Sequence, residues 1–150
     1  MSNIQAKQAE FMIAGEQKVN TLTETLKNHK TDPQAILYMN LFNEESTELR
    51  QAFQSFLDAD QPDIKLAAIA DIADGVADAI VTLMGLCNSV GIPFHDVYEE
   101  VHRSNMLKCI KQDDGTYRIL KRADGKIIKP FEWEKPQIMN ILRYRLINGD

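Results

Sequence analysis

The stretch PDIKLAAIADIADGVADAIVTLMGLCNSV, which runs from Pro62 to Val90, decides how this chain folds. Its apolar residues recur every three or four positions, the spacing that places side chains on one face of an α-helix. Pro62 is typical of a helix start and Gly91 of a helix end, so we predict one helix of about 40 Å at 1.5 Å per residue. The apolar side of this helix comprises Leu66, Ile69, Ile72, Val76, Ile80, Leu83 and Met84.

The opposite strip of the same helix carries aspartates and small residues. Asp71, Asp74 and Asp78 lie three or four positions apart, so they share one narrow stripe of the helix. No Lys or Arg occurs from Leu66 through His102, so no nearby basic side chain relieves the repulsion between the three carboxylates. We infer that another group neutralises them and that this strip can admit a ligand.

A second acidic cluster lies in the preceding helix. Thr31 and Asp32 before Pro33 are typical of a helix start, and we predict that this helix continues to about Leu57. Three glutamates share one side of it: Glu44, Glu45 and Glu48. Two adjacent helices that carry carboxylates can supply part of the oxygen shell that Mg²⁺ prefers. An ion held there could neutralise phosphate oxygens and orient a water for attack, which suits hydrolysis of a phosphoanhydride.

The remaining pattern predicts further helices and a small β-structure. Residues 3–27 are predicted to be helical with a break near Gly15, and a fourth helix is predicted from Pro93 to about Met106. Four helices joined by short turns favour an all-α, four-helix bundle-like fold. The turn dipeptides Asp114-Gly115 and Asp124-Gly125 predict an added β-hairpin. A short helix is then predicted at about residues 136–146.

Length and composition limit the possible classes of protein. The chain has 150 residues and 44% apolar content, which predicts a single domain over residues 1–150. We expect its helical core at about 3–108 and the hairpin and C-terminal extension at about 109–150. The net charge of −5 argues against binding to a nucleic acid polymer. No stretch is apolar enough to span a membrane, and two cysteines outside any metal-type spacing favour a cytoplasmic setting.

Three segments carry a resemblance to a known superfamily. Glu44-Glu-Ser-Thr-Glu48 resembles the Glu-Glu-x-x-Glu motif of the all-α nucleoside triphosphate pyrophosphohydrolases, the MazG-like superfamily that includes phosphoribosyl-ATP pyrophosphohydrolase. The run from Asp71 to Gly85, followed by Gly91-Ile92, resembles the third helix of that family. Glu100-Val-His-Arg-Ser-Asn-Met-Leu-Lys108, together with Asp124-Gly-Lys-Ile-Ile-Lys-Pro130, is similar to its nucleotide-contacting end. The resemblance covers roughly residues 8–136.

The resemblance implies an activity, a cofactor and an assembly. It implies cleavage between the α and β phosphates, dependent on Mg²⁺ with Mn²⁺ as the other option, by a helical homodimer or homotetramer. Glu45 and Glu48 would be metal ligands, and Glu44 would be a ligand or the base that orients water. The implied substrate-binding residues are Asn105, Lys108, Lys126 and Lys129.

The second acidic motif of the family can be aligned in two ways. The family pattern is Glu-x-x-Asp; Asp78 matches its aspartate, but Gly75 then stands at the glutamate position, with Asp74 as the possible substitute. Alternatively, Asp71-Ile-Ala-Asp74 is the functional pair and Asp78 is an outer ligand. All three aspartates therefore remain candidate metal ligands.

Three functions are compatible with these patterns. The first is a pyrophosphohydrolase that converts nucleoside or deoxynucleoside triphosphates to monophosphates and pyrophosphate, removing noncanonical or surplus nucleotides. The second is a phosphoribosyl-ATP pyrophosphohydrolase. The third is a non-enzymatic helical interaction module whose acids form a solvated edge. Trp133, the lone tryptophan, has no partner spacing that implies catalysis, so we expect it to pack or to cap.

Overall fold

The chain forms two compact units, Met1–Ile92 and Pro93–Asp150. The computed structural model describes residues 3–28 and 32–149, so Thr31 of the expected helix start lies outside the described residues. The first unit holds α1 (Ile4–Ala14), α2 (Leu22–Lys27), α3 (Pro33–Asp58) and α4 (Pro62–Val90). The second unit holds α5 (Phe94–Met106), β1 (Cys109–Lys111), β2 (Tyr117–Ile119) and α6 (Ile138–Asn148).

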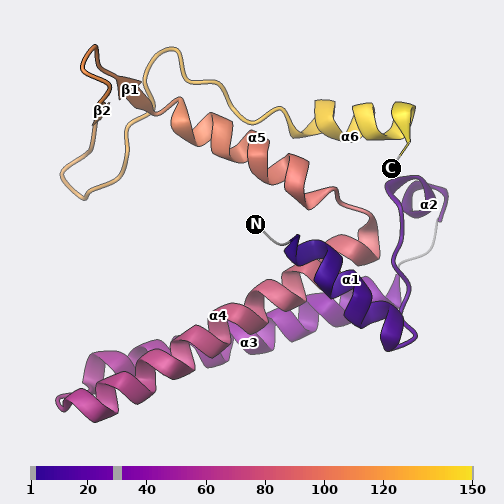
Figure 1. The fold of residues 1–150 in the computed structure, drawn as a ribbon, viewed down its shortest axis with the longest axis horizontal. Coiled ribbons are helices and arrows are strands. Elements are labelled where there is room, and N and C mark those ends of the chain that lie inside the picture. The colour runs from indigo at the N-terminus through magenta and orange to yellow at the C-terminus, as the bar shows by residue number, and fades with distance from the viewer. Residues whose placement is uncertain (1–2, 29–31, 150) are drawn as a thin grey trace. The chain divides into compact units, whose positions relative to one another are not determined.

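The first unit is built on α3 and α4, which lie side by side as a long antiparallel pair (Figure 1). Asp32 caps α3, since its carboxylate accepts a hydrogen bond from the Gln34 amide at 2.8 Å, and Pro33 follows at the first position. Gly91 ends α4 in the left-handed conformation, with φ of 70°. The helix bounds predicted from these start and stop residues are therefore confirmed.

Small residues of α4 form its contact with α3. A Cβ built at Gly75 would stand 3.3 Å from Cα and Cβ of Leu49, and Gly85 lies under the ring of Tyr38. Thr82, on the same strip, is only 6% exposed. The small residues that we expected to admit a ligand thus admit α3, whereas Leu66 and Ile69 on the apolar side are 66% and 47% exposed.

Polar contacts tie the N-terminal segment to this pair. α1 ends at Gly15, as predicted, but the chain then stays non-helical until α2 begins at Leu22. Within that segment the Asn20 amide donates to the Asn88 carbonyl at 2.9 Å. Thr21 and Glu24 form a reciprocal capping box that starts α2. The break predicted near Gly15 is thus longer than expected, because these contacts hold it in an extended path along α4.

The second unit combines two helices with a pair of turns. β1 and β2 are antiparallel, with Cys109 opposite Ile119, and the chain folds back again at the bridge between Lys121 and Ile127. Both turns have glycine at a φ of 83°, Gly115 and Gly125, as the Asp-Gly pairs predicted. α6 is attached to α5 by the ion pair between Arg145 Nη2 and Asp96 Oδ2 at 2.5 Å.

These elements confirm the fold class expected from the sequence: helices, a small β-hairpin and a short C-terminal helix. The expectation of a single domain stays a prediction. None of the described helices is long and apolar enough to cross a membrane.

Candidate functional site

The acidic residues of α3 lie in the middle of that helix. Glu45 is partly buried, whereas Glu44 and Glu48 are exposed. The difference follows from their helical positions, because Glu45 stands four residues before Leu49, which contacts α4. Glu45 is therefore the glutamate of this cluster that stands at the seam between the two helices.

The acidic residues of α4 flank the same seam. Asp71, Asp74 and Asp78 are all exposed, and Gly75 between them faces α3. The absence of a side chain at Gly75 lets the α4 backbone approach Leu49 closely. If Asp78 matches the aspartate of the family pattern, the glutamate position is therefore taken by a glycine that packs closely against α3.

The charges of the two helices act on one carboxylate. Desolvation raises the pKa of Glu45 most, followed by the negative charges of Asp78, Glu48, Glu44 and Asp74. The charges of four other acids thus act on Glu45, and Asp71 is not among them. None of the six carboxylates takes part in the ion pairs formed within residues 3–28 and 32–149.

The carboxylate oxygens of this cluster are suitable ligands for a divalent cation, but the side chains do not converge on one point. Among the described residues, no three acidic, histidine or cysteine side chains are close enough to hold a metal ion. Glu48, Asp74 and Asp78 are exposed. A bound cation could therefore select other staggered rotamers of these side chains. Desolvation and then the neighbouring negative charges raise the pKa of Glu45, and a cation would offset those charges. Carboxylate oxygens are ligands that Mg²⁺ accepts.

Three of the four expected substrate-binding residues meet around one aromatic ring in the second unit. Lys129 Nζ lies 3.6 Å and Lys108 Nζ 5.9 Å from the centroid of the Trp133 ring. Lys108 Nζ also donates to Asn105 Oδ1 at 2.6 Å. Lys126 is outside this group: it is exposed on the second turn, where its backbone amide donates to Asp124 Oδ1 at 3.1 Å.

Sequence reasoning gave Trp133 no role at this site. Its Nε1 donates to the Ser104 carbonyl at 3.0 Å, near the end of α5, so the expected capping role is correct. Its contacts with two lysines were not foreseen, since they join residues far apart along the chain. The segment Lys129-Pro-Phe-Glu-Trp133, with a cation and an aromatic four residues apart, is the one signal that could have indicated them.

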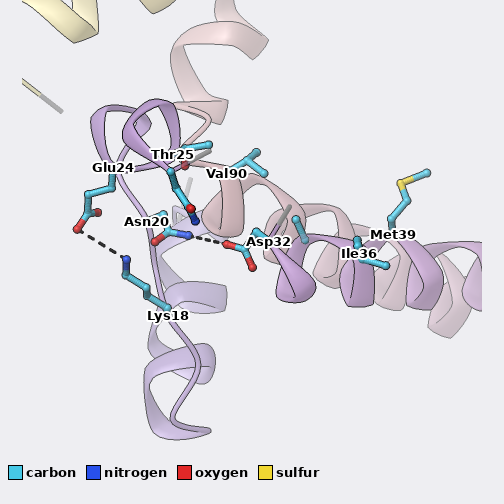
Figure 2. A pocket seen from close by; sticks show the side chains of 10 residues that line it. Lys18, Asn20, Glu24, Thr25, Asp32, Ile36, Met39 and Val90 are labelled. Atoms are coloured by element: carbon cyan, nitrogen blue, oxygen red, sulfur yellow. Dashed lines mark hydrogen bonds and ion pairs between the residues drawn. The ribbon is translucent and has the colours of Figure 1, made fainter. Parts of the chain in front are cut away.

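Two pockets of the described structure contain none of the expected site residues. A pocket of about 400 Å³ lies between α2 and the start of α3 (Figure 2). Its polar groups are already paired: Asn20 Nδ2 donates to Asp32 Oδ2 at 3.0 Å, and Lys18 lies 4.0 Å from Glu24. The second hollow, of about 610 Å³, lies between α5 and α6, where Glu100 and Arg103 bind each other. We assign neither a chemical role.

A helical pair with carboxylates from both helices around one seam fits the all-α nucleotide pyrophosphohydrolases that the sequence resembles. The comparison with protein families agrees: the phosphoribosyl-ATP pyrophosphohydrolase family matches residues 10–105. The chain belongs to this family, a part of the MazG-like superfamily, and is therefore an enzyme that hydrolyses phosphoanhydride bonds. The family is generally dependent on a divalent metal. No curated protein matches the sequence significantly.

Proposed function

We propose that this protein cleaves nucleoside or deoxynucleoside triphosphates between the α and β phosphates, releasing a monophosphate and pyrophosphate. The observation that carries the proposal is the position of Glu45 on α3, where desolvation and then the negative charges of Asp78, Glu48, Glu44 and Asp74 raise its pKa. Neighbouring carboxylates that no basic side chain neutralises favour the binding of a cation. A cellular role in removing noncanonical or surplus nucleotides follows from this reaction.

In this proposal Mg²⁺, with Mn²⁺ as the other option, is the cofactor. Glu45 and Glu48 would hold it together with aspartates of α4, for which Asp71, Asp74 and Asp78 are the candidates. When bound, the metal supplies neutralisation of phosphate oxygens and activation of a water. Glu44, which is exposed beside Glu45, would orient the attacking water or serve as a further ligand.

The nucleotide would be held by the residues gathered in the second unit. Lys108 and Lys129 supply positive charge for phosphate oxygens, and Asn105 supplies an amide. Lys126 lies outside the group formed by Asn105, Lys108 and Lys129, so it would be at most a weaker phosphate contact.

The second candidate substrate is phosphoribosyl-ATP, which the family name favours. Both substrates present a phosphoanhydride between α and β phosphates to the same carboxylates, so the chemistry at Glu45 is shared. The non-enzymatic interaction module is disfavoured because the chain belongs to a family of hydrolases.

We further propose a homodimer or homotetramer. Leu66, Ile69 and Val76 lie on the side of α4 away from α3 and are 66%, 47% and 43% exposed. A contiguous apolar side of a helix is ordinarily covered by another element or another chain. A second copy of the chain would cover this side of α4.

We also propose a reducing, cytoplasmic setting, with which the free thiols of Cys87 and Cys109 agree.

Replacement of Glu48 by Gln tests the catalytic proposal. The variant keeps the size of the side chain and removes its charge, so we expect kcat/KM for pyrophosphate release to fall at least about 100-fold without loss of helix content. The matched control is Glu10→Gln on α1, an exposed glutamate outside the cluster, which should stay within about twofold of the wild-type rate. Near-normal activity of Glu48→Gln would overturn the assignment.

A further inference from the structure

The indole of Trp133 is fixed in place by the last turn of α5. Its Nε1 donates to the Ser104 carbonyl at 3.0 Å, one of the carbonyls that the helix end leaves without an internal partner. The Ser104 side chain, only 1% exposed, donates in return from Oγ to the Glu134 carbonyl at 2.7 Å. These two reciprocal bonds join residues 133 and 134 to one turn of helix, so the ring cannot change its orientation freely.

Two cations share this fixed ring without a counter-ion. Lys129 Nζ, at 3.6 Å, and Lys108 Nζ, at 5.9 Å from the ring centroid, both lie within the range of a cation–π interaction. In the part of the chain that the structure describes, neither ammonium group forms an ion pair with a carboxylate. The negative face of the indole therefore offsets part of the repulsion between two lysines that come from separate segments.

The remaining groups leave this cluster open to an anion. Lys129 is exposed and Lys108 half-buried, so solvent and ligands reach them. Asn105 accepts from Lys108 through Oδ1, which leaves its amide nitrogen as a further donor. Two ammonium groups and an amide donor are suited to the oxygens of a polyphosphate.

We propose that Trp133 is a positioning residue, which holds the ammonium groups of Lys108 and Lys129 together as one site for the polyphosphate of the nucleotide. The proposal rests on the proposed function for the identity of the ligand. The indole does not touch the reacting atoms in this account. It acts by setting where the two lysines stand before the phosphates arrive.

Fluorescence of Trp133 tests the site directly, since this is the lone tryptophan of the chain. The full-length protein is titrated with inorganic tripolyphosphate in the presence of chelator, so neither turnover nor metal is needed. We expect a saturable change in emission, because an anion bound to the two ammonium groups alters the electrostatic surroundings of the indole beside them. Absence of a saturable change in the wild type would overturn the proposal.

Lysine variants show whether the response belongs to this site. Replacing both Lys108 and Lys129 by Gln should weaken the apparent affinity for tripolyphosphate at least about tenfold, as expected for the loss of two charged contacts. The matched control is Lys111→Gln in β1, an exposed lysine outside the cluster, which should stay within twofold. If Lys111→Gln lowered the affinity for tripolyphosphate as much, the effect would come from overall charge and not from this site, and the proposal would be overturned.

Two replacements of Trp133 separate positioning from capping. Both Trp133→Phe and Trp133→Leu lose the hydrogen bond to Ser104, but only Phe keeps an aromatic face for the lysines. Measured by calorimetry, Trp133→Leu should bind tripolyphosphate about tenfold more weakly than Trp133→Phe. Trp133→Leu should also have a KM for the nucleotide about tenfold higher than that of Trp133→Phe, whereas the kcat values of the two variants should agree within twofold. Equal binding by the two variants would leave only a structural role and overturn the proposal.

The two proposals fail in different ways. If no nucleotide is hydrolysed but tripolyphosphate binds with the expected variant pattern, the proposed function is wrong and the polyphosphate site stands. If nucleotides are hydrolysed and the calorimetric difference between Phe and Leu is absent, the positioning role of Trp133 is wrong and the proposed function stands.

Discussion

The ring of Tyr38 on α3 occupies the space that a side chain at Gly85 on α4 would fill, because a Cβ built there would overlap three ring atoms. Tyr38 is 3% exposed and cannot turn away easily. Its hydroxyl donates to Gln17 Oε1 at 2.5 Å and accepts from Gln8 Nε2 at 3.3 Å. This one contact joins α4, α3, α1 and the segment that follows α1.

Gly85→Ala should destabilise the protein by about 2 kcal/mol, the usual cost of overpacking a core. Alanine is intrinsically better than glycine within a helix, so a net loss of stability can come only from displacement of the Tyr38 ring. Urea unfolding measures the change. In a Tyr38→Leu background most of the destabilisation by Gly85→Ala should disappear. A Gly85→Ala protein as stable as wild type would contradict the close contact between Gly85 and the Tyr38 ring.

Asp78→Asn should stabilise the metal-free protein. Desolvation, then Asp78, raises the pKa of Glu45, so removing the Asp78 charge should raise the metal-free Tm at pH 7 by roughly 1 °C while weakening Mg²⁺ binding. The folded state holds a proton on Glu45 more tightly than the unfolded state, so the gain should shrink as the pH falls and Glu45 becomes protonated.

The control for Asp78→Asn is Asp63→Asn. Asp63 lies in the first turn of α4, where a negative charge is favourable, so its loss should not raise Tm. Thermal unfolding with chelator, at several pH values, measures both variants. A lower metal-free Tm for Asp78→Asn would show that the acids of α3 and α4 do not repel one another.

Glu100 should make the stability of the protein depend on pH. Arg103 binds its carboxylate from Nε at 2.8 Å and Nη2 at 2.9 Å, and the Gln137 amide donates at 2.7 Å. These bonds lower the pKa of Glu100 from an ordinary 4.5 to about 2. Because the folded pKa is depressed, the stabilisation is complete above pH 4.5 and is lost as the pH falls towards 2.

Glu100→Gln should therefore be less stable than wild type at pH 7, with a difference that narrows between pH 4.5 and 2. Urea unfolding midpoints across this range measure it. Glu132→Gln, an exposed acid outside these contacts, should show no such trend. A Glu100→Gln difference that is constant with pH would contradict the assigned bonds to Arg103 and Gln137.

Charged residues on the apolar side of α4 should break the assembly. We expect light scattering after size exclusion to give a dimer or tetramer for wild type and smaller species for the Leu66→Lys, Ile69→Lys double variant. Phe131→Lys is the matched control, since Phe131 is fully exposed in the other unit. A monomeric wild type, or an equal effect of the control, would exclude this side of α4 as the interface.

Much of the fold could be predicted because its signals are local. Asp32 with Pro33, Pro62 and Gly91 each set a helix end through their own backbone chemistry, and Asp114-Gly115 and Asp124-Gly125 each set a turn. The extended path between Gly15 and Leu22 was missed. It depends on the contact between Asn20 and Asn88, which no local pattern reveals.

Part of the candidate site could also be predicted, because helical spacing is a local signal. Helical spacing placed Glu45 and Asp78 on the edges of their helices, and the structure sets their charges against each other. Spacing within one helix could not show which side of α4 faces α3, so Gly75 was interpreted as part of a ligand strip although it packs on Leu49. Trp133 was missed because its partners are distant in sequence.

The proposed hydrolysis is tested by measuring pyrophosphate release from nucleoside triphosphates, deoxynucleoside triphosphates and phosphoribosyl-ATP, each with Mg²⁺ and with chelator. We expect release of pyrophosphate and a monophosphate from some triphosphates, and we expect chelator to abolish it. Turnover of phosphoribosyl-ATP alone would contradict the proposed substrate. No release from any of these nucleotides, or release that chelator does not reduce, would contradict the proposed function of the carboxylates around Glu45.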